Sequence, residues 1–322
     1  MELIQHRFQA MGTEITVTLI AELAQLDHAA TAFASLQADF EVFGRDGWAW
    51  GDGALGDFNR ALARGEAAWL PPALHSLMAR AWLRREATGG LYEPRIATLV
   101  RLWGFDCMEH LREEPPPAAQ IEAALAELAA APPYDGGASY GPAPGVGWDL
   151  GGIGKGEIID RGLELLSAFG FKDAMIDAGG NLAVRGRRPD RAWRVGIRDP
   201  RSDGQRILLA IDLGDEAVIT HGDDQRYFEY GGRRYAHLLD PRTGWPGRGL
   251  QSLTVIDSDA ARADADGAAL YVAGPNDWPE LAQTLDLRQV VAVDEAGVIW
   301  LTPAIAARVQ LCTDAPVRVL GS

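Results

Sequence analysis

Residues 148–170 read WDLGGIGKGEIIDRGLELLSAFG, and the character of the sequence changes at this stretch. Its closely spaced glycines, Gly151, Gly152, Gly154 and Gly156, predict a tight turn after a strand, and the apolar residues behind them predict a helix. Short strand-like runs then follow one another up to residue 258 without a regular alternation of strand and helix. The sequence therefore predicts an α+β fold with mostly antiparallel strands rather than regular βαβ units.

The first half of the chain carries most of the predicted helices. An alternating run at 13–20 predicts a strand, and amphipathic or capped patterns predict three helices, over residues 22–41, 72–87 and 117–131. The Pro/Gly-rich segment at about 131–147 predicts a flexible hinge or an exposed excursion.

Two hairpins are predicted towards the end of the chain. Residues 226–240 form two strand-like runs around Gly231 and Gly232, and residues 289–302 form a second such pair. No internal repeat or low-complexity tract is present, and the length of the chain allows either one large domain or two lobes.

Composition limits the classes of partner. The chain has 322 residues, a net charge of −15 and a pI near 4.8, which argues against nucleic acid or an anionic membrane as the main partner. Cys107 and Cys312 are too far apart for CxxC spacing, so neither a disulfide framework nor a zinc site is indicated. No export signal and no apolar run long enough for a membrane span are present, and we expect a cytoplasmic protein.

Residues 262–274, RADADGAALYVAG, place Asp264 and Asp266 before an apolar run of small residues. Carboxylates at the start of a helix satisfy free N–H groups and the positive end of the helix dipole. Two carboxylates this close can also hold a divalent cation. The residues alone leave both interpretations open.

Three further segments carry polar groups in suggestive places. DLGGIGKGEIID, residues 149–160, predicts either an anion site at a helix N-terminus with Lys155 or merely a tight turn. HLLDPRTG, residues 237–244, offers His237 as a proton shuttle or a plain turn capped by an aspartate. Tyr92, behind two glycines, can stack on a planar ring or mark a helix boundary.

Read in order, seven segments resemble the FAD:protein FMN transferase family, also called the ApbE family. These segments are MGTEITV, TGGLYEPRIATLVRLWGF, DLGGIGKGEIID, DAGGNLAVRG, WRVGIRDP, ITHGDDQRYFEYGGRRYAHLLDPRTGWP and SLTVID with ADADGAALYVAG. Each match is weak by itself, but the unbroken order of seven is specific.

The resemblance implies a single domain over residues 1–322, made of two interleaved α+β lobes with FAD in the cleft between them. It also implies Mg²⁺-dependent transfer of FMN from FAD to a threonine hydroxyl of an acceptor protein, with release of AMP. An FAD-binding relative without transferase activity, or an FAD pyrophosphatase that gives FMN and AMP, is the alternative.

Site residues are implied position by position. His237 and Asp264 match catalytic positions, and Asp264 also matches the principal metal carboxylate, with Gly152 contributing to the metal site through its carbonyl. The implied cofactor-binding positions are Met11, Gly90, Leu91, Tyr92, Asp149 and Lys155.

The sequence departs from the family pattern around the metal site. Ala268 stands where the family has its metal-site threonine, and Asp266, where the family has an apolar residue, is a possible substitute ligand. Gly267 replaces a small residue and His221 replaces the serine of a TSG segment. Gly154 stands in place of an alanine, whereas Asn59 is retained.

Overall fold

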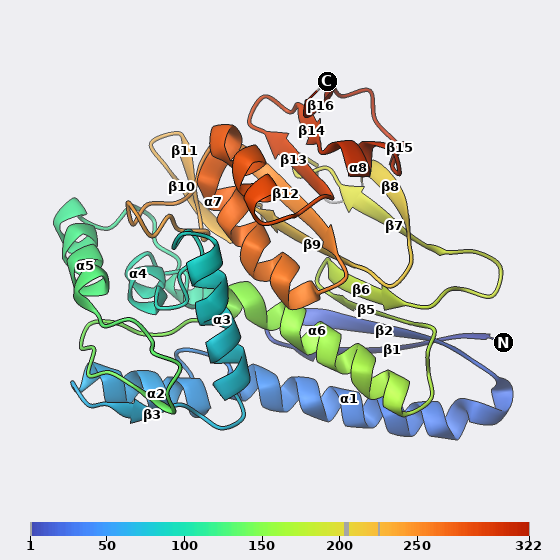
Figure 1. Ribbon diagram of the computed structural model, residues 1–322, viewed down its shortest axis with the longest axis horizontal. Coiled ribbons are helices and arrows are strands. Elements are labelled where there is room, and N and C mark those ends of the chain that lie inside the picture. The colour runs from blue at the N-terminus through green and yellow to red at the C-terminus, as the bar shows by residue number, and fades with distance from the viewer. Residues whose placement is uncertain (1, 203–205, 225, 322) are drawn as a thin grey trace.

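A nine-stranded sheet forms the centre of the computed structural model, which describes residues 2–202, 206–224 and 226–321 (Figure 1). Its strand order is β1-β2-β5-β6-β9-β12-β13-β14-β16, and every neighbouring pair is antiparallel except β14 and β16. The strands are β1 (Glu2–Ala10), β2 (Thr13–Ala21), β5 (Ala174–Ala178), β6 (Asn181–Arg185), β9 (Ala217–Gly222), β12 (Leu250–Asp257), β13 (Val290–Asp294), β14 (Ile299–Leu301) and β16 (Val317–Val319).

Helices α1, α6 and α7 cover one face of this sheet, as Figure 1 shows with α6 and α7 crossing in front of the strands. The apolar side chains between them form the main core, which includes Phe40 of α1, Ile159 of α6 and Val255 of β12. The helices are α1 (Leu26–Asp46), α2 (Ala54–Ala63), α3 (His75–Ala87), α4 (Ala97–Leu102), α5 (Ala118–Ala130), α6 (Gly151–Ala168), α7 (Ala260–Thr284) and α8 (Pro303–Ala306).

A second, smaller core lies on the opposite face of the sheet. There the three-stranded sheet of β15 (Gln310–Leu311), β8 (Ile207–Leu213) and β7 (Trp193–Arg198) packs its apolar residues against those of β6, β12 and β13. Strand β12 is buried along most of its length because both cores use it.

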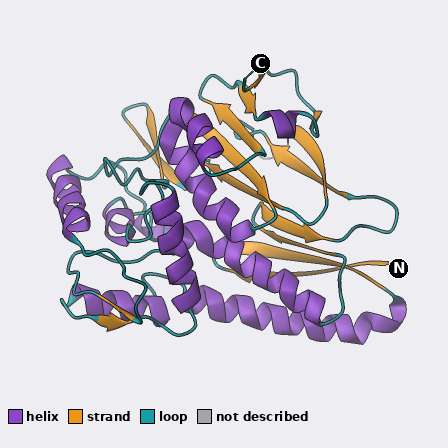
Figure 2. Ribbon diagram, in the orientation of Figure 1, coloured by secondary structure: helices purple, strands orange, loops and turns teal. Residues whose placement is uncertain are grey.

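Helices α2 to α5 and their loops form a separate part of the same chain, on the left of Figure 2. The Pro/Gly-rich segment belongs to this part and is packed rather than extended from the surface, because Tyr134, Tyr140 and Val146 are buried. It contains β4 (Ser139–Tyr140), which pairs with β3 (Ala68–Trp69). Asn59, which the resemblance singled out, forms two hydrogen bonds with the backbone of Trp148, in the segment that leads into α6.

The α+β prediction is confirmed, as are the strand at 13–20 and both hairpins. In the first hairpin β10 (Tyr227–Tyr230) pairs with β11 (Arg233–Ala236) across Gly231 and Gly232, whose φ angles are +59° and +74°. The prediction of a glycine-rich turn at 151–156 is wrong, because these glycines already belong to α6. Among the described residues, no helix is both long and apolar enough to cross a membrane.

The crossing of α6 and α7 is close enough to require glycine at position 156. A Cβ on Gly156 would lie 2.2 Å from the carbonyl oxygen of Ala260 and 2.6 Å from the Cα of Ala261. Asp160 of α6 accepts hydrogen bonds from the amides of Ala260 and Ala261 at 2.8 and 3.2 Å, so it satisfies the first turn of α7.

We predict opposite effects for alanine at two glycines of α6. Gly156→Ala should lower the free energy of unfolding by more than about 2 kcal/mol, because two backbones must move apart. Gly154→Ala should raise it by up to about 1 kcal/mol through helix propensity, since its Cβ would meet the Phe43 ring at an ordinary 3.5 Å. Urea denaturation of both variants measures the difference, and equal effects would contradict the account of the crossing.

Candidate active site

The N-terminus of α6 carries one part of the candidate site. Asp149 accepts a hydrogen bond from the amide of Gly151 at 2.8 Å, while the amides of Ile153 and Gly154 donate to the Leu150 carbonyl. The helix N-terminus predicted for this segment is therefore present, and one of its free amides, that of Gly151, already donates to Asp149. Burial raises the pKa of Asp149, and the Gly151 amide opposes that effect.

Helix α7, which packs closely against α6, carries a second part of the site, and it begins earlier than its sequence suggested. Its first residue is Ala260, and its N-cap is Asp259, whose side chain accepts a hydrogen bond from the amide of Arg262 at 2.8 Å. Asp264 and Asp266 consequently lie inside the helix and do not cap it, so the prediction of a helix start at these residues is wrong. Ala268 is buried one turn beyond Asp264.

Asp264 is a buried carboxylate that faces α6. It is 1% exposed, and its Oδ2 accepts a hydrogen bond from the amide of Gly156 at 3.1 Å. The ordinary helical acceptor for that amide is the carbonyl of Gly152, so the carboxylate and this carbonyl converge on one N–H. Burial raises the pKa of Asp264 to about 6, and the positive charge of Lys155 opposes the rise.

His221, near the end of β9, faces the same carboxylate. Its Nε2 lies 3.9 Å from Oδ1 of Asp264 and has no hydrogen-bond partner in the part of the chain that the structure describes. A Cβ on Gly267 would lie 2.8 Å from this Nε2, so the imidazole rests directly on the glycine. Burial, aided by the charge of Lys155, lowers the pKa of His221 to about 3.

Asp266 points to a different environment. It is 0% exposed, and its Oδ1 accepts a hydrogen bond from Nε of Arg84 on α3 at 2.9 Å, while Nε of Arg262 lies 3.5 Å from Oδ2. Two guanidinium groups therefore neutralise Asp266, whereas the described residues give Asp264 no such ion pair with arginine or lysine.

Tyr92 packs its ring against the start of α6. Its side chain is 6% exposed, and its hydroxyl has no hydrogen-bond partner among the described residues. A Cβ on Gly152 would lie 3.2 Å from Cε2 of Tyr92, which places the ring edge against α6. Burial, then the charges of Asp149 and Asp264, raise the pKa of Tyr92 well above its usual range.

The segment that carries Tyr92 is fixed by a buried acidic residue. Glu93 is 6% exposed and is hydrogen-bonded by Arg85 at 2.5 Å and by Arg95 at 2.9 Å. Gly89 and Gly90 precede it with φ angles of +61° and +83°, a conformation that side chains with a Cβ rarely adopt. Leu91, between Gly90 and Tyr92, is partly buried against the main core.

His237 follows β11 and completes the polar cluster. Its amide donates to the carbonyl of Arg226 at 3.1 Å, and its Nδ1 lacks a hydrogen-bond partner within the described ranges. Burial, and then the charges of Arg226 and Lys155, lower the pKa of His237 to about 4. The positive charge of Lys155 acts on both His237 and Asp264, since it lowers the pKa of each.

Two further predicted residues have clear positions. Met11 lies in the β1–β2 turn with φ of +53°, and a Cβ on Gly44 of α1 would meet its Cγ at 3.1 Å. Asp240 of the DPRTG segment accepts hydrogen bonds from the amide and the guanidinium of Arg242, which confirms the capped turn.

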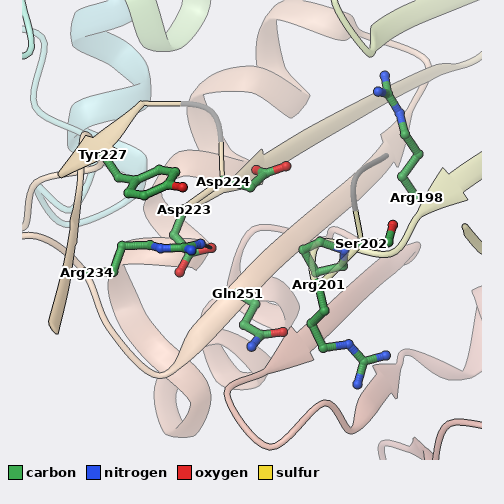
Figure 3. Close-up of a pocket in the computed structure, with 9 residues that line it drawn as sticks. Arg198, Arg201, Ser202, Asp223, Asp224, Tyr227, Arg234 and Gln251 are labelled. Atoms are coloured by element: carbon green, nitrogen blue, oxygen red, sulfur yellow. Dashed lines mark ion pairs between the residues drawn. The ribbon is translucent and has the colours of Figure 1, made fainter. Parts of the chain in front are cut away.

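A cavity that the sequence did not predict opens immediately after His221 (Figure 3). It has a volume of about 660 Å³, and Arg234 in its wall stacks 4.0 Å from the Tyr227 ring centroid and lies 3.6 Å from Asp223. The sequence signal for this cavity was the high density of charged residues in GDDQRYFEYGGRRY, which follows a buried strand. The lining residues are Arg198, Pro200, Arg201, Ser202, Asp223, Asp224, Tyr227, Arg234 and Gln251.

A separate set of metal-ligand donors lies on the loop after α4. Asp106, Cys107 and His110 place one donor atom each within 4.8 Å of one another, the only group of three such side chains in the described ranges. His110 and Asp106 form a 2.7 Å hydrogen bond within it. This group shares no residue with the candidate site on α6 and α7.

Comparisons with known proteins agree with the resemblance seen in the sequence. A family model described as the ApbE family matches residues 11–292. An FAD:protein FMN transferase from Rhodobacter capsulatus is 36% identical over 285 residues, which are 87% of this chain and 53% of that protein. One from Treponema pallidum is 33% identical over 244 residues, 69% of this chain and 66% of that protein. The chain thus spans about half the length of the Rhodobacter relative.

Solved structures share the fold over nearly the whole chain. An ApbE protein from Thermotoga maritima superposes with a TM-score of 0.85 at 28% identity, covering 95% of this chain and 99% of that one. The flavinyl transferase ApbE of Pseudomonas stutzeri, in its apo form, gives a TM-score of 0.80 at 26% identity, covering 95% and 96%.

We predict that both buried histidines remain neutral from pH 8 to below pH 5, because burial lowers the pKa of His221 to about 3 and of His237 to about 4. The unfolded chain takes up these protons first, so the two histidines lower the free energy of unfolding as the pH falls below about 6.5. NMR titration of their ring Cε1–H signals, assigned with His221→Gln and His237→Gln, measures this directly. An inflection between pH 6 and 7 in either signal would contradict the predicted burial effect.

We also predict that Asp266 acts as an ion-pair partner. Asp266→Asn should lower the free energy of unfolding by about 2 kcal/mol or more, because it leaves Arg84 without its carboxylate. The double variant Asp266→Leu with Arg84→Met should recover most of that loss. A stable Asp266→Asn protein that had lost divalent-cation binding would instead make Asp266 a metal ligand.

Proposed function

Since the chain belongs to the ApbE family, we propose that it transfers FMN from FAD to a threonine hydroxyl of an acceptor protein and releases AMP. The observation that carries the proposal is the buried carboxylate of Asp264 at the start of α6, where it accepts a hydrogen bond from the Gly156 amide, next to Lys155 in the chain. The charge of Lys155 lowers the pKa of Asp264 and of His237, so these three implied positions are electrostatically linked. Relatives that are 36% and 33% identical to the chain are named FAD:protein FMN transferases.

A divalent cation fits the group around Asp264. The buried Asp264 carboxylate accepts one hydrogen bond, from the Gly156 amide, and forms no ion pair with a guanidinium group in the described chain, so its negative charge is poorly compensated. Nε2 of His221, which has no hydrogen-bond partner among the described residues, faces it. We propose that Asp264 and the Gly152 carbonyl hold this cation, for which Mg²⁺ is the ion that the resemblance implies. When bound, the cation stabilises negative charge on the pyrophosphate oxygens.

The chain's own residues account for the remaining chemistry. Lys155 supplies a positive charge for a phosphate next to Asp264. His237, held neutral by burial, accepts the proton of the threonine hydroxyl at an imidazole nitrogen as the threonine oxygen bonds to the phosphorus of the FMN half. The bond from that phosphorus to the bridging oxygen breaks, and AMP leaves with the oxygen.

We assign cofactor contacts to the residues that surround these groups. Asp149 and Tyr92 lie beside the N-terminus of α6, and the Gly90–Leu91 backbone leads into Tyr92. Met11 lies beside the end of α1, whose Phe43 approaches Gly154. These positions are the ones at which we expect FAD to contact the chain.

A second candidate function rests on Ala268. Its methyl group carries no oxygen for a cation, so a chain with a weakened metal site could bind FAD without transfer, or hydrolyse it to FMN and AMP. Water then takes the part of the threonine hydroxyl.

Mass spectrometry separates these functions. The chain is incubated with FAD, Mg²⁺ and an acceptor protein bearing the threonine, and transfer predicts that the acceptor gains the mass of one FMN while AMP appears in equal amount. FMN and AMP without an acceptor adduct would establish hydrolysis. Intact FAD that remains bound to the chain would establish binding alone.

Asp264 and Asp266 provide a matched pair for testing the site. We predict that Asp264→Asn lowers cation-dependent FAD cleavage by about a hundredfold or more, because it removes the charge that neutralises the cation. Asp266→Asn changes an equally buried carboxylate of the same helix and should retain cleavage in the fraction that stays folded. Unchanged turnover in Asp264→Asn, assayed beside its circular dichroism spectrum, would refute the assignment of Asp264.

A further inference from the structure

Three departures from the family pattern lie against one another at the cation site. From their geometry we infer that the Nε2 atom of His221 takes the place of the missing threonine hydroxyl as a donor to the cation bound by Asp264. The inference rests on the proposed function only in so far as a cation binds at Asp264.

The imidazole of His221 has an unused nitrogen in the right place. The residue is 8% exposed, and Nε2 has no hydrogen-bond partner among the residues that the structure describes. A neutral imidazole carries a proton on one nitrogen and a lone pair on the other. With the proton on Nδ1, the lone pair of Nε2 lies 3.9 Å from Oδ1 of Asp264.

Gly267 permits this position of the ring. A Cβ there would lie 2.8 Å from both Nε2 and Cδ2 of His221, closer than side-chain contacts allow. A residue with a side chain at 267 would therefore push the imidazole away from Asp264. We therefore treat the three departures as coupled. The imidazole at 221 needs the glycine at 267, and it compensates for the hydroxyl that is missing at 268.

The distance fits two ligands of one ion after a small adjustment. Donor atoms at about 2.1 Å from one cation are roughly 3 to 4 Å apart, depending on the angle between the bonds. The observed 3.9 Å between Nε2 and Oδ1 lies within that range. In an α-helix the Gly152 carbonyl accepts from the Gly156 amide, which also donates to Asp264, so this carbonyl lies near the carboxylate. We assign it as a third donor to the cation, from the facing helix.

A nitrogen donor changes the choice of metal. Mg²⁺ prefers oxygen ligands in a strict octahedron, whereas imidazole suits first-row transition metals, and Mn²⁺ accepts both kinds of donor. We therefore expect the chain to bind Mn²⁺ in preference to Mg²⁺.

Electron paramagnetic resonance tests this with Mn²⁺ added to the full chain in the absence of FAD. The free-ion signal measures affinity, and electron spin echo modulation detects coupling of bound Mn²⁺ to imidazole nitrogen. We predict nitrogen coupling in the native chain, its loss in His221→Ser and an affinity about tenfold or more lower in that variant. His28→Ser, at an exposed histidine on α1, should retain both the coupling and the affinity.

A rebuilt oxygen site provides the converse test. The triple variant His221→Ser, Gly267→Ala and Ala268→Thr fills the space of the ring and restores a hydroxyl. It should shift the ratio of Mn²⁺ to Mg²⁺ affinity towards Mg²⁺ by about tenfold or more. Circular dichroism confirms that each variant is folded.

Several results would overturn the inference: no Mn²⁺ binding at millimolar concentration, bound Mn²⁺ without nitrogen coupling, or unchanged affinity in His221→Ser. These measurements do not depend on flavin transfer. Nitrogen-coupled Mn²⁺ in a chain that never modifies an acceptor would refute the proposed function alone. FMN transfer by a chain whose Mn²⁺ affinity is unchanged in His221→Ser would refute this inference alone.

Discussion

The close crossing of α6 and α7 is the constraint on which the rest of the structure depends. Glycine at 156 lets the two backbones approach, because any Cβ there would lie 2.2 Å from the Ala260 carbonyl oxygen. Each helix then satisfies a polar group of the other. Asp160 of α6 accepts from the first amides of α7, and Asp264 of α7 accepts from the Gly156 amide. The crossing thereby holds the carboxylate of Asp264 directly opposite the start of α6.

Burial controls the charges of the site. It raises the pKa of Asp264 and lowers the pKa values of His221 and His237, so both histidines are neutral at neutral pH. A carboxylate with little compensation then lies beside an imidazole with a free lone pair, an arrangement typical of a cation site. Asp266, two residues further along α7, is instead neutralised by arginines. The same helix therefore carries one carboxylate suited to a ligand and one suited to structure.

The sequence predicted those features that depend on local pattern. Alternation identified β2, and Gly231 with Gly232 identified the β10–β11 turn, because such signals arise from neighbouring residues. The start of α7 was missed because Asp259, the true cap, precedes residues without an apolar pattern, whereas Asp264 precedes an obvious one. The glycines of α6 read as a turn because their helical conformation depends on packing against α7 and Tyr92. Arg84 and His221 approach α7 from distant segments, so no local pattern could separate Asp264 from Asp266 or couple His221 to Gly267.

Cation binding by Asp264 and His221 is tested most directly by a crystal structure of the chain with Mn²⁺ and FAD, measured at a wavelength where manganese scatters anomalously. We predict an anomalous peak between the Asp264 carboxylate and Nε2 of His221, with the FAD pyrophosphate beside Lys155. A peak confined to Asp106, Cys107 and His110, or FAD bound away from α6 and α7, would contradict it.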